Sequence, residues 1–144
     1  MELWSKTFEN KKKKMNANFF ELQGKTITSI QGAEENSDVV NIMTSDGATY
    51  LLFHSQVCCE YVRVFNIVGD IESVIGAEIS LAEDDSLDTN PNVSYSYRNE
   101  SRTWTKFTII TINGSKLEIW WLGESNGYYR ETVSVEKLIK ITKD

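Results

Sequence analysis

The sequence contains few of the residue types that charged and catalytic sites use, and no long hydrophobic run. Only four arginines and one histidine occur among its 144 residues. The longest apolar runs, such as 119–122, are far shorter than the ~18–20 residues of a membrane-spanning helix. No apolar stretch of secretory-signal type follows the N-terminal lysines. We therefore expect no membrane segment and a cytoplasmic location.

Cysteine is scarce as well, and its placement is unusual. The only two cysteines, Cys58 and Cys59, are adjacent in the chain. A disulfide needs two Cβ atoms that face each other at a suitable separation, and neighbours in sequence seldom meet this requirement. The sequence therefore predicts two reduced thiols.

Motifs of common enzyme classes are missing. The chain contains neither the G-x-G-x-x-G nor the G-x-x-x-x-G-K-[ST] phosphate-binding pattern. It also lacks the G-x-S-x-G turn of serine hydrolases. The sequence thus gives no positive indication of an enzyme, and we predict no catalytic residue, no metal and no cofactor.

The charges divide the chain into a basic arm and an acidic body. The net charge is −6, and residues 1–14, with five lysines against Glu2 and Glu9, carry +3, which leaves −9 for residues 15–144. We predict a polar, lysine-rich arm over residues 1–18 and a single ligand-binding domain over residues 19–144. A body of this charge argues against binding to nucleic-acid polymers or anionic membranes, because both depend on basic side chains.

Short segments with β-type patterning dominate the domain, and one helix is expected among them. Asp46-Gly47 and Asn113-Gly114 are typical of tight hairpin turns. We predict strands over residues 25–30, 38–44, 48–54, 61–65, 77–82, 103–112, 115–122 and 128–135. The apolar spacing of residues 67–75, between Asn66 and Gly76, predicts a short helix. The expected fold is α+β: an antiparallel sheet of about six or seven strands with one short helix.

The period of two along the last strands separates their two faces. Leu117, Ile119 and Trp121 share one face, which we predict to be core. Trp120 points to the opposite face, as do Tyr128 and Arg130 on the following strand. Residues 84–101 are polar and contain the only proline, so we predict a long connection there.

Two polar groupings raise alternative chemistries. His54, Cys58, Cys59 and Glu60 contain metal-ligand and nucleophile types, but a structural zinc site needs a second ligand pair that the chain lacks. A nucleotide-degrading enzyme that uses Cys58 or Cys59 with His54 stays open as an alternative, as does an acidic pair that attacks a phosphodiester. The acidic cluster at residues 83–88 lacks the spacing of a calcium loop, and we interpret it as solvated surface.

Aromatic and arginine side chains are the remaining candidates for ligand binding. Aromatic rings stack on nucleobases, guanidinium groups bind phosphates, and amides read base edges. Stacking and charge pairing in an acidic body suit a small nucleotide better than a polymer. The candidates are Arg63, Arg98, Arg102, Trp104, Trp120, Asn126, Tyr128 and Arg130.

Seven segments together resemble a family of small bacteriophage proteins, the phage Thoeris anti-defence proteins of the first type. The resemblance extends from about Gly24 to Val135 and rests on the order and spacing of the segments. They are Gly24-Lys-Thr-Ile-Thr-Ser-Ile, Ser45-Asp-Gly-x-Thr-Tyr50, His54-x3-Cys-Cys-Glu60, Val68-Gly-Asp-Ile-x3-Ile-Gly76, Ala82-Glu83, Thr103-Trp-Thr-x-Phe107 and Gly123-x-Ser-Asn-Gly-Tyr-Tyr129.

The resemblance implies a protein that binds a cyclic ADP-ribose isomer and sequesters it without degrading it. Such a protein blocks activation of the Thoeris immune effector in the host bacterial cytoplasm. The resemblance also implies a homo-oligomer with pockets near its subunit contacts. A protein-binding inhibitor of a host defence protein stays open as an alternative function.

Overall fold

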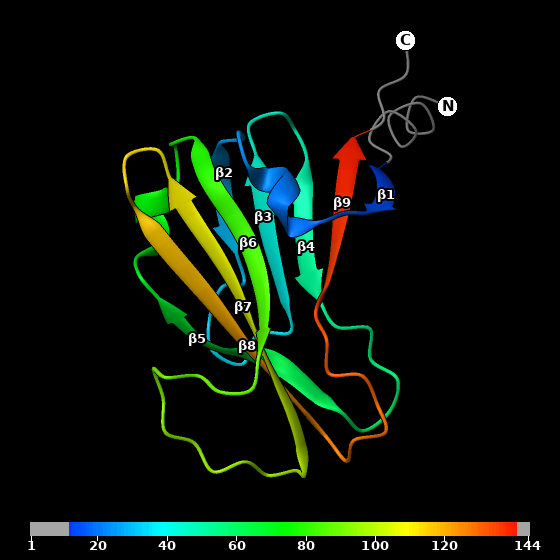
Figure 1. The fold of residues 1–144 in the computed structure, drawn as a ribbon. Helices are drawn as coiled ribbons and strands as arrows, with labels where there is room; N and C mark the ends of the chain where they lie inside the picture. Colours follow the sequence, from blue (N-terminus) through cyan, green and yellow to red (C-terminus); the bar gives the residue numbers. More distant parts are fainter. Residues whose placement is uncertain (1–11, 141–144) are drawn as a thin grey trace, which may run out of the picture.

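The computed structural model describes residues 12–140, and these residues form nine strands and two short 3-10 turns (Figure 1). The turns are η1 (Phe19–Leu22) and η2 (Ile71–Val74). The strands are β1 (Lys12–Asn16), β2 (Ile27–Gln31), β3 (Val39–Thr44), β4 (Thr49–Phe53), β5 (Tyr61–Val68), β6 (Ile79–Leu87), β7 (Ser101–Thr111), β8 (Lys116–Ser125) and β9 (Ser134–Lys140).

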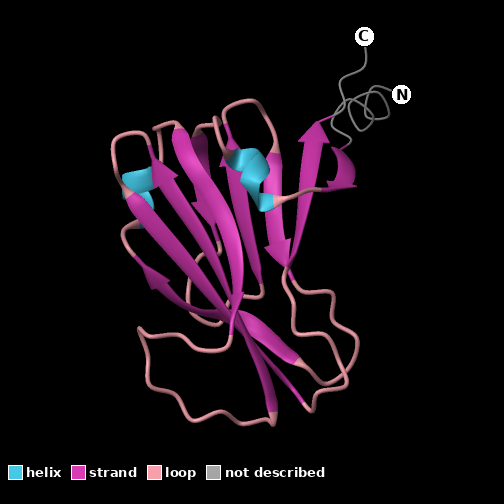
Figure 2. Cartoon of the chain, in the orientation of Figure 1, coloured by secondary structure: helices cyan, strands magenta, loops and turns pink. Residues whose placement is uncertain are grey.

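The strands form two antiparallel sheets. The five-stranded sheet has the order β1-β9-β4-β3-β2, and the four-stranded sheet has the order β5-β8-β7-β6. One hydrophobic core contains side chains from both sheets, including Ile42 and Tyr50 from the first and Phe107 and Trp121 from the second. The sheets therefore pack face to face as a sandwich, with the loops gathered at its two ends (Figures 1 and 2).

The predicted α+β fold is wrong, because the described residues contain no α-helix (Figure 2). Strand β5 continues to Val68, through the first residues of the expected helix. Gly69 then adopts a φ of 105°, and a Cβ at that position would lie 2.4 Å from the carbonyl oxygen of Lys116. Only one 3-10 turn follows, capped by Asp70, whose side chain accepts the backbone N–H of Glu72. The β-branched residues of this segment favour a strand over a helix.

Both predicted hairpins are confirmed. Strands β3 and β4 pair around Asp46 and Gly47, and strands β7 and β8 pair around Asn113 and Gly114. The acidic residues 83–85 lie within β6, so the connection between β6 and β7 is limited to residues 88–100. The strand predicted over residues 128–135 is wrong, since residues 126–133 form a loop and β9 begins only at Ser134.

The alternation predicted for β8 is confirmed. Leu117, Ile119 and Trp121 are buried in the core between the sheets. Trp120 belongs to a second apolar cluster on the outer face of the four-stranded sheet, together with Trp104 and Leu122. Two of the candidate site residues, Trp104 and Trp120, therefore belong to this outer cluster.

Part of the predicted N-terminal arm is an element of the sandwich. Strand β1 pairs with β9 in a register that sets Met15 opposite Lys137. Residues 1–11 of the arm lie outside the described residues. Between residues 12 and 140, no helix has the length and the apolar character needed to span a membrane.

Candidate ligand-binding site

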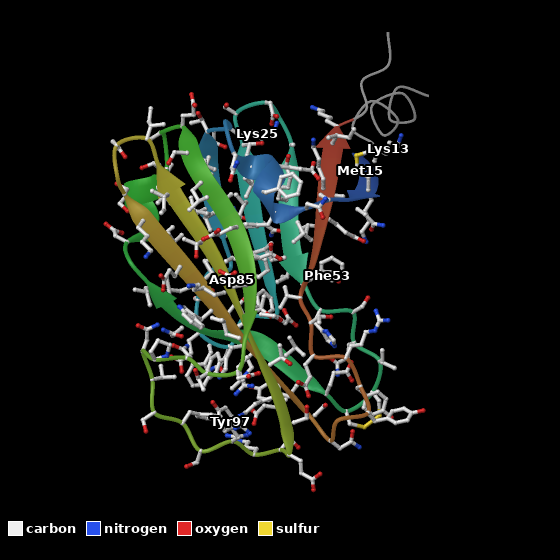
Figure 3. The ribbon with its side chains drawn as sticks, in the orientation of Figure 1. Lys13, Met15, Lys25, Phe53, Asp85 and Tyr97 are labelled. Carbon is white, nitrogen blue, oxygen red and sulfur yellow. A yellow bond between two sulfur atoms is a disulfide. The ribbon has the colours of Figure 1, made fainter. Side chains whose placement is uncertain are left out.

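The structure divides the eight candidate residues between two regions at the lower end of the sandwich. One region is the outer face of the four-stranded sheet under the 88–100 loop, where Figure 3 shows Tyr97. The other lies where loops 54–60 and 126–133 meet, below Phe53 at the end of β4 (Figures 1 and 3). The first region contains Arg63, Arg98, Arg102, Trp104 and Trp120, and the second contains Asn126, Tyr128 and Arg130.

Arg63 in β5 is buried and already has an anionic partner. Its Nη1 donates to Oε1 of the buried Glu124 at 3.0 Å, and its Nη2 lies 3.3 Å from the hydroxyl of Tyr95. The guanidinium carbon lies 4.0 Å from the ring centroid of Tyr61. These contacts pair the charge of Arg63 with Glu124, so a phosphate would have to compete with this carboxylate, and the buried Nε of the guanidinium has no hydrogen-bond partner.

Trp104 and Trp120 also serve packing on this face. Trp104 is fully buried, and its indole N–H donates to the hydroxyl of Tyr97 at 3.0 Å. The two indole rings meet edge to face with centroids 6.2 Å apart. The indole N–H of Trp120 donates to Glu118. Neither ring offers a free face for stacking on a base.

Two further arginines belong to this region. Arg98 lies in the 88–100 loop, and Arg102 lies just after the loop in β7. The backbone N–H of Arg98 donates to Oε2 of Glu124 at 2.8 Å. The guanidinium of Arg102 stacks 4.0 Å from the ring centroid of Tyr97. Arg102 lines an open depression of about 420 Å³, which it shares with Asp88, Glu100 and Ser101. Two carboxylates beside one arginine disfavour an anionic ligand here.

The second region contains a more enclosed cavity, which has a volume of about 320 Å³. It is lined by His54, Ser55, Val57, Arg130, Thr132 and Ser134. Arg130 is exposed and, like the exposed Arg98 and Arg102, takes part in none of the ion pairs found among the described residues. We call this space the His54–Arg130 cavity.

His54 is held by two hydrogen-bond acceptors. Its Nδ1 lies 2.7 Å from the carbonyl oxygen of Thr132, and its Nε2 lies 2.7 Å from Oε2 of Glu60. A carbonyl oxygen and a carboxylate can only accept, so both ring nitrogens must carry a proton for both bonds to form. This arrangement pairs His54 with Glu60 and buries both side chains, so Arg130 is the cation of the cavity lining that stays outside an ion pair.

Glu60 is the buried counter-ion of His54. Burial alone would raise the pKa of its carboxyl, but the hydrogen bonds from His54, from the backbone N–H of Cys58 and from the backbone N–H of Val57 lower the pKa to about 2. The two backbone bonds measure 2.8 and 2.9 Å. Gln56 closes the turn by donating to the carbonyl oxygen of Glu60 at 2.7 Å. Loop 54–60 is therefore folded around one carboxylate.

The lowered pKa of Glu60 predicts a pH-dependent stability. The folded-state value of about 2 lies below the usual 4.5, so the stabilisation is fully present above pH 4.5 and is lost as the pH falls from 4.5 toward 2. We expect the Tm of the wild type to fall more steeply over this range than the Tm of Glu60→Gln. Thermal unfolding followed by circular dichroism at several pH values measures both curves, and parallel curves would refute the prediction.

Glu131 fixes the 126–133 loop that carries Arg130. This buried carboxylate accepts the Thr103 hydroxyl at 2.9 Å and also the Ser125 hydroxyl, whose oxygen accepts the backbone N–H of Gly127 at 3.0 Å. Gly123 allows the loop to approach the sheet, since a Cβ there would lie 2.5 Å from the carbonyl oxygen of Glu131. Glu131 was not among the residues predicted from the sequence, because an isolated glutamate directly after Arg130 gives no signal of burial.

The prediction of two reduced thiols is wrong, because Cys58 and Cys59 are joined by a disulfide. The expectation relied on the facing Cβ atoms that a disulfide needs and that adjacent residues seldom provide, whereas here the two neighbours are bridged with Cα atoms 3.7 Å apart. Both residues are exposed on loop 54–60, and the backbone N–H of Cys58 is fixed by Glu60. Among the described residues, no group of three or more His, Cys, Asp or Glu side chains could hold a metal ion.

Comparison with known proteins gives one result. No curated protein and no solved structure matches this chain. A family model for a domain of unknown function, DUF7448, matches residues 20–135, which include every strand from β2 to β8 and both loops that form the His54–Arg130 cavity. The chain therefore belongs to the DUF7448 family.

Proposed function

We propose that this protein binds a cyclic ADP-ribose-type signalling nucleotide and sequesters it without degrading it. In the host bacterial cytoplasm, this sequestration would block activation of the Thoeris immune effector. The observation that carries the proposal is the His54–Arg130 cavity, because its lining combines an exposed arginine outside every ion pair of the described residues with the hydroxyl-bearing residues Ser55, Thr132 and Ser134. The resemblance of seven sequence segments to the Thoeris anti-defence proteins supplies the ligand class.

The lining of the cavity suits a phosphate-bearing ligand. Arginine binds phosphate through paired, charge-assisted hydrogen bonds, and Ser55, Thr132 and Ser134 offer hydroxyl donors beside it. Tyr128 lies two residues before Arg130 and is 83% exposed, so its ring is free to stack on an adenine. Of the eight residues predicted from sequence, we therefore assign Arg130 to the ligand, with Tyr128 as the stacking residue, whereas Oδ1 of Asn126 already accepts the backbone N–H of Tyr128 at 3.0 Å.

A second copy of the chain would complete the site. At about 320 Å³ the cavity is at the lower limit of ligand pockets, which usually measure ~300–1,000 Å³. Val57 and Tyr128 are 71% and 83% exposed at the same end of the sandwich. Val57 also lines the cavity, so a second copy of the chain that covers this side chain would extend the lining. A homo-oligomer would enclose the ligand between two such surfaces.

The contacts around His54 favour binding over turnover. A general base needs a nitrogen with a free lone pair, but both ring nitrogens of His54 face acceptors. A cysteine nucleophile needs a thiolate, but Cys58 and Cys59 are joined in the disulfide. While the disulfide is closed, neither partner of a Cys–His pair is available.

Depletion and recovery of the nucleotide test the proposal. The protein is mixed with a cyclic ADP-ribose isomer, the mixture is filtered, and the retained complex is heated. We expect a filtrate depleted of nucleotide and the release of intact nucleotide on denaturation. Degraded nucleotide would indicate the enzyme alternative. An undepleted filtrate would overturn the proposal and favour a protein-binding inhibitor.

Arg130→Ala is expected to weaken nucleotide binding. Loss of a hydrogen-bonded charge contact of about 1.5–3 kcal/mol raises the Kd by roughly 10- to 100-fold. Lys116→Ala is the matched control, because Lys116 is an exposed cation at the β7–β8 turn, at the other end of the sandwich (Figure 1). Isothermal titration measures both variants, and equal affinities for the two would exclude Arg130 from the site.

A further inference from the structure

The vicinal disulfide lies on the same loop as half of the cavity lining. Loop 54–60 contributes His54, Ser55 and Val57 to the cavity and carries Cys58 and Cys59 on its exposed side. Both cysteines are solvent-exposed, so a small thiol can reach either sulfur atom. Accessible disulfides of this kind exchange readily with thiols, whereas buried structural disulfides are protected.

A short chain of hydrogen bonds connects the disulfide to His54. The backbone N–H of Cys58 donates to Oε1 of Glu60 at 2.8 Å, and Oε2 of the same carboxylate lies 2.7 Å from Nε2 of His54. Gln56 binds the carbonyl oxygen of Cys58 at 3.1 Å. Both backbone polar groups of Cys58 are thus engaged within the loop. A change in the Cys58 backbone must therefore act on Glu60 and, through it, on His54.

We propose that the Cys58–Cys59 pair is a reversible thiol–disulfide modification site whose redox state sets the position of Glu60 and His54 in the cavity. Closure of the disulfide ties the two side chains into one ring with the intervening peptide and restricts residues 58 and 59. Opening the ring releases this restriction and frees the Cys58 N–H to leave Glu60. The inference does not depend on the proposed nucleotide, because it concerns only groups of this chain.

The reaction balances with a dithiol as the reductant. One thiolate of the dithiol attacks one cysteine Sγ, breaks the Sγ–Sγ bond, forms a mixed disulfide and leaves the other cysteine as a thiolate. The second thiolate of the dithiol attacks the mixed disulfide, closes its own disulfide and releases the remaining cysteine thiolate. Two electrons pass from the dithiol to the cysteines, and the two protons that the dithiol loses are taken up by the cysteine thiolates.

Alkylation and mass spectrometry test the modification site. The chain has only two cysteines, so every thiol signal comes from this pair. Purified without reductant, the full chain should resist iodoacetamide, and after treatment with dithiothreitol both cysteines should be alkylated. Alkylation without reductant, or a disulfide-linked dimer on a non-reducing gel, would overturn the proposed site.

Nuclear magnetic resonance tests the coupling to the cavity. His54 is the only histidine, so its imidazole gives a single set of ring signals. We expect these signals to differ between the oxidised and the reduced protein by more than their line width. In the Cys58→Ser/Cys59→Ser variant, dithiothreitol should leave them unchanged. Identical His54 signals in the oxidised and reduced wild type would overturn the coupling, even if the disulfide itself forms.

Discussion

Replacing Arg63 with methionine is expected to lower the free energy of unfolding by about 3–5 kcal/mol, because it leaves the Glu124 carboxylate buried without its cation. Glu124 is fully buried, and its other contacts are the Tyr95 hydroxyl at 3.4 Å and the backbone N–H of Arg98. Neither neutral donor replaces a guanidinium. Urea unfolding at neutral pH, followed by circular dichroism, measures the loss.

A double variant shows whether the loss comes from the uncompensated charge. Arg63→Met/Glu124→Leu removes both ions of the pair, and such replacements of a buried pair are often close to neutral. We therefore expect the double variant to regain most of the stability that the single variant loses. If Arg63→Met is as stable as the wild type, Arg63 is not a structural residue and is free to serve a ligand.

Trp104→Ala is expected to destabilise the protein by about 3–5 kcal/mol, which is the usual cost of truncating a buried aromatic side chain. The ring packs edge to face against Phe65, Tyr97 and Trp120, with centroid separations of 5.1, 6.4 and 6.2 Å. Its removal would leave a cavity under the 88–100 loop. It would also leave the Tyr97 hydroxyl without its indole donor.

Trp104→Phe separates packing from ligand binding. This variant keeps an aromatic ring in the cluster, so we expect a smaller loss of stability than in Trp104→Ala. Its affinity for a cyclic ADP-ribose isomer should equal that of the wild type, because the His54–Arg130 cavity is formed by other elements. If Trp104→Phe keeps its stability but loses affinity for the nucleotide, Trp104 belongs to the ligand site.

Local sequence signals predicted the hairpins and the alternation of β8 correctly, because both depend on residues that are neighbours in the chain. In both turns the glycine adopts the positive φ, 88° at Gly47 and 89° at Gly114. The prediction of a helix over residues 67–75 is wrong, because the first of these residues complete strand β5 and only a 3-10 turn follows Gly69. Gly69 follows the end of β5 with a φ of 105°, at a place where a Cβ would clash with the backbone of Lys116, a residue that is distant in the sequence.

The site could be predicted only in part, because its contacts also join residues that are distant in the sequence. The partner of Arg63 lies 61 positions away in the chain, and no local pattern indicates which arginine meets a buried carboxylate. The His54–Arg130 cavity similarly joins residues on two loops, and the loop with Arg130 had been predicted as a strand. Residue types alone indicated a nucleotide, whereas the fold pairs Arg63 with a buried carboxylate and places Arg130 in a cavity.

Chemical-shift mapping with a cyclic ADP-ribose isomer tests most directly whether the ligand occupies the His54–Arg130 cavity. The imidazole of His54 and the indoles of Trp104 and Trp120 report on the two candidate regions separately. The account predicts large shifts for His54 and for the backbone amides of Arg130, Thr132 and Ser134, with the two indole signals unchanged. Shifts confined to the indoles of Trp104 and Trp120 would contradict it.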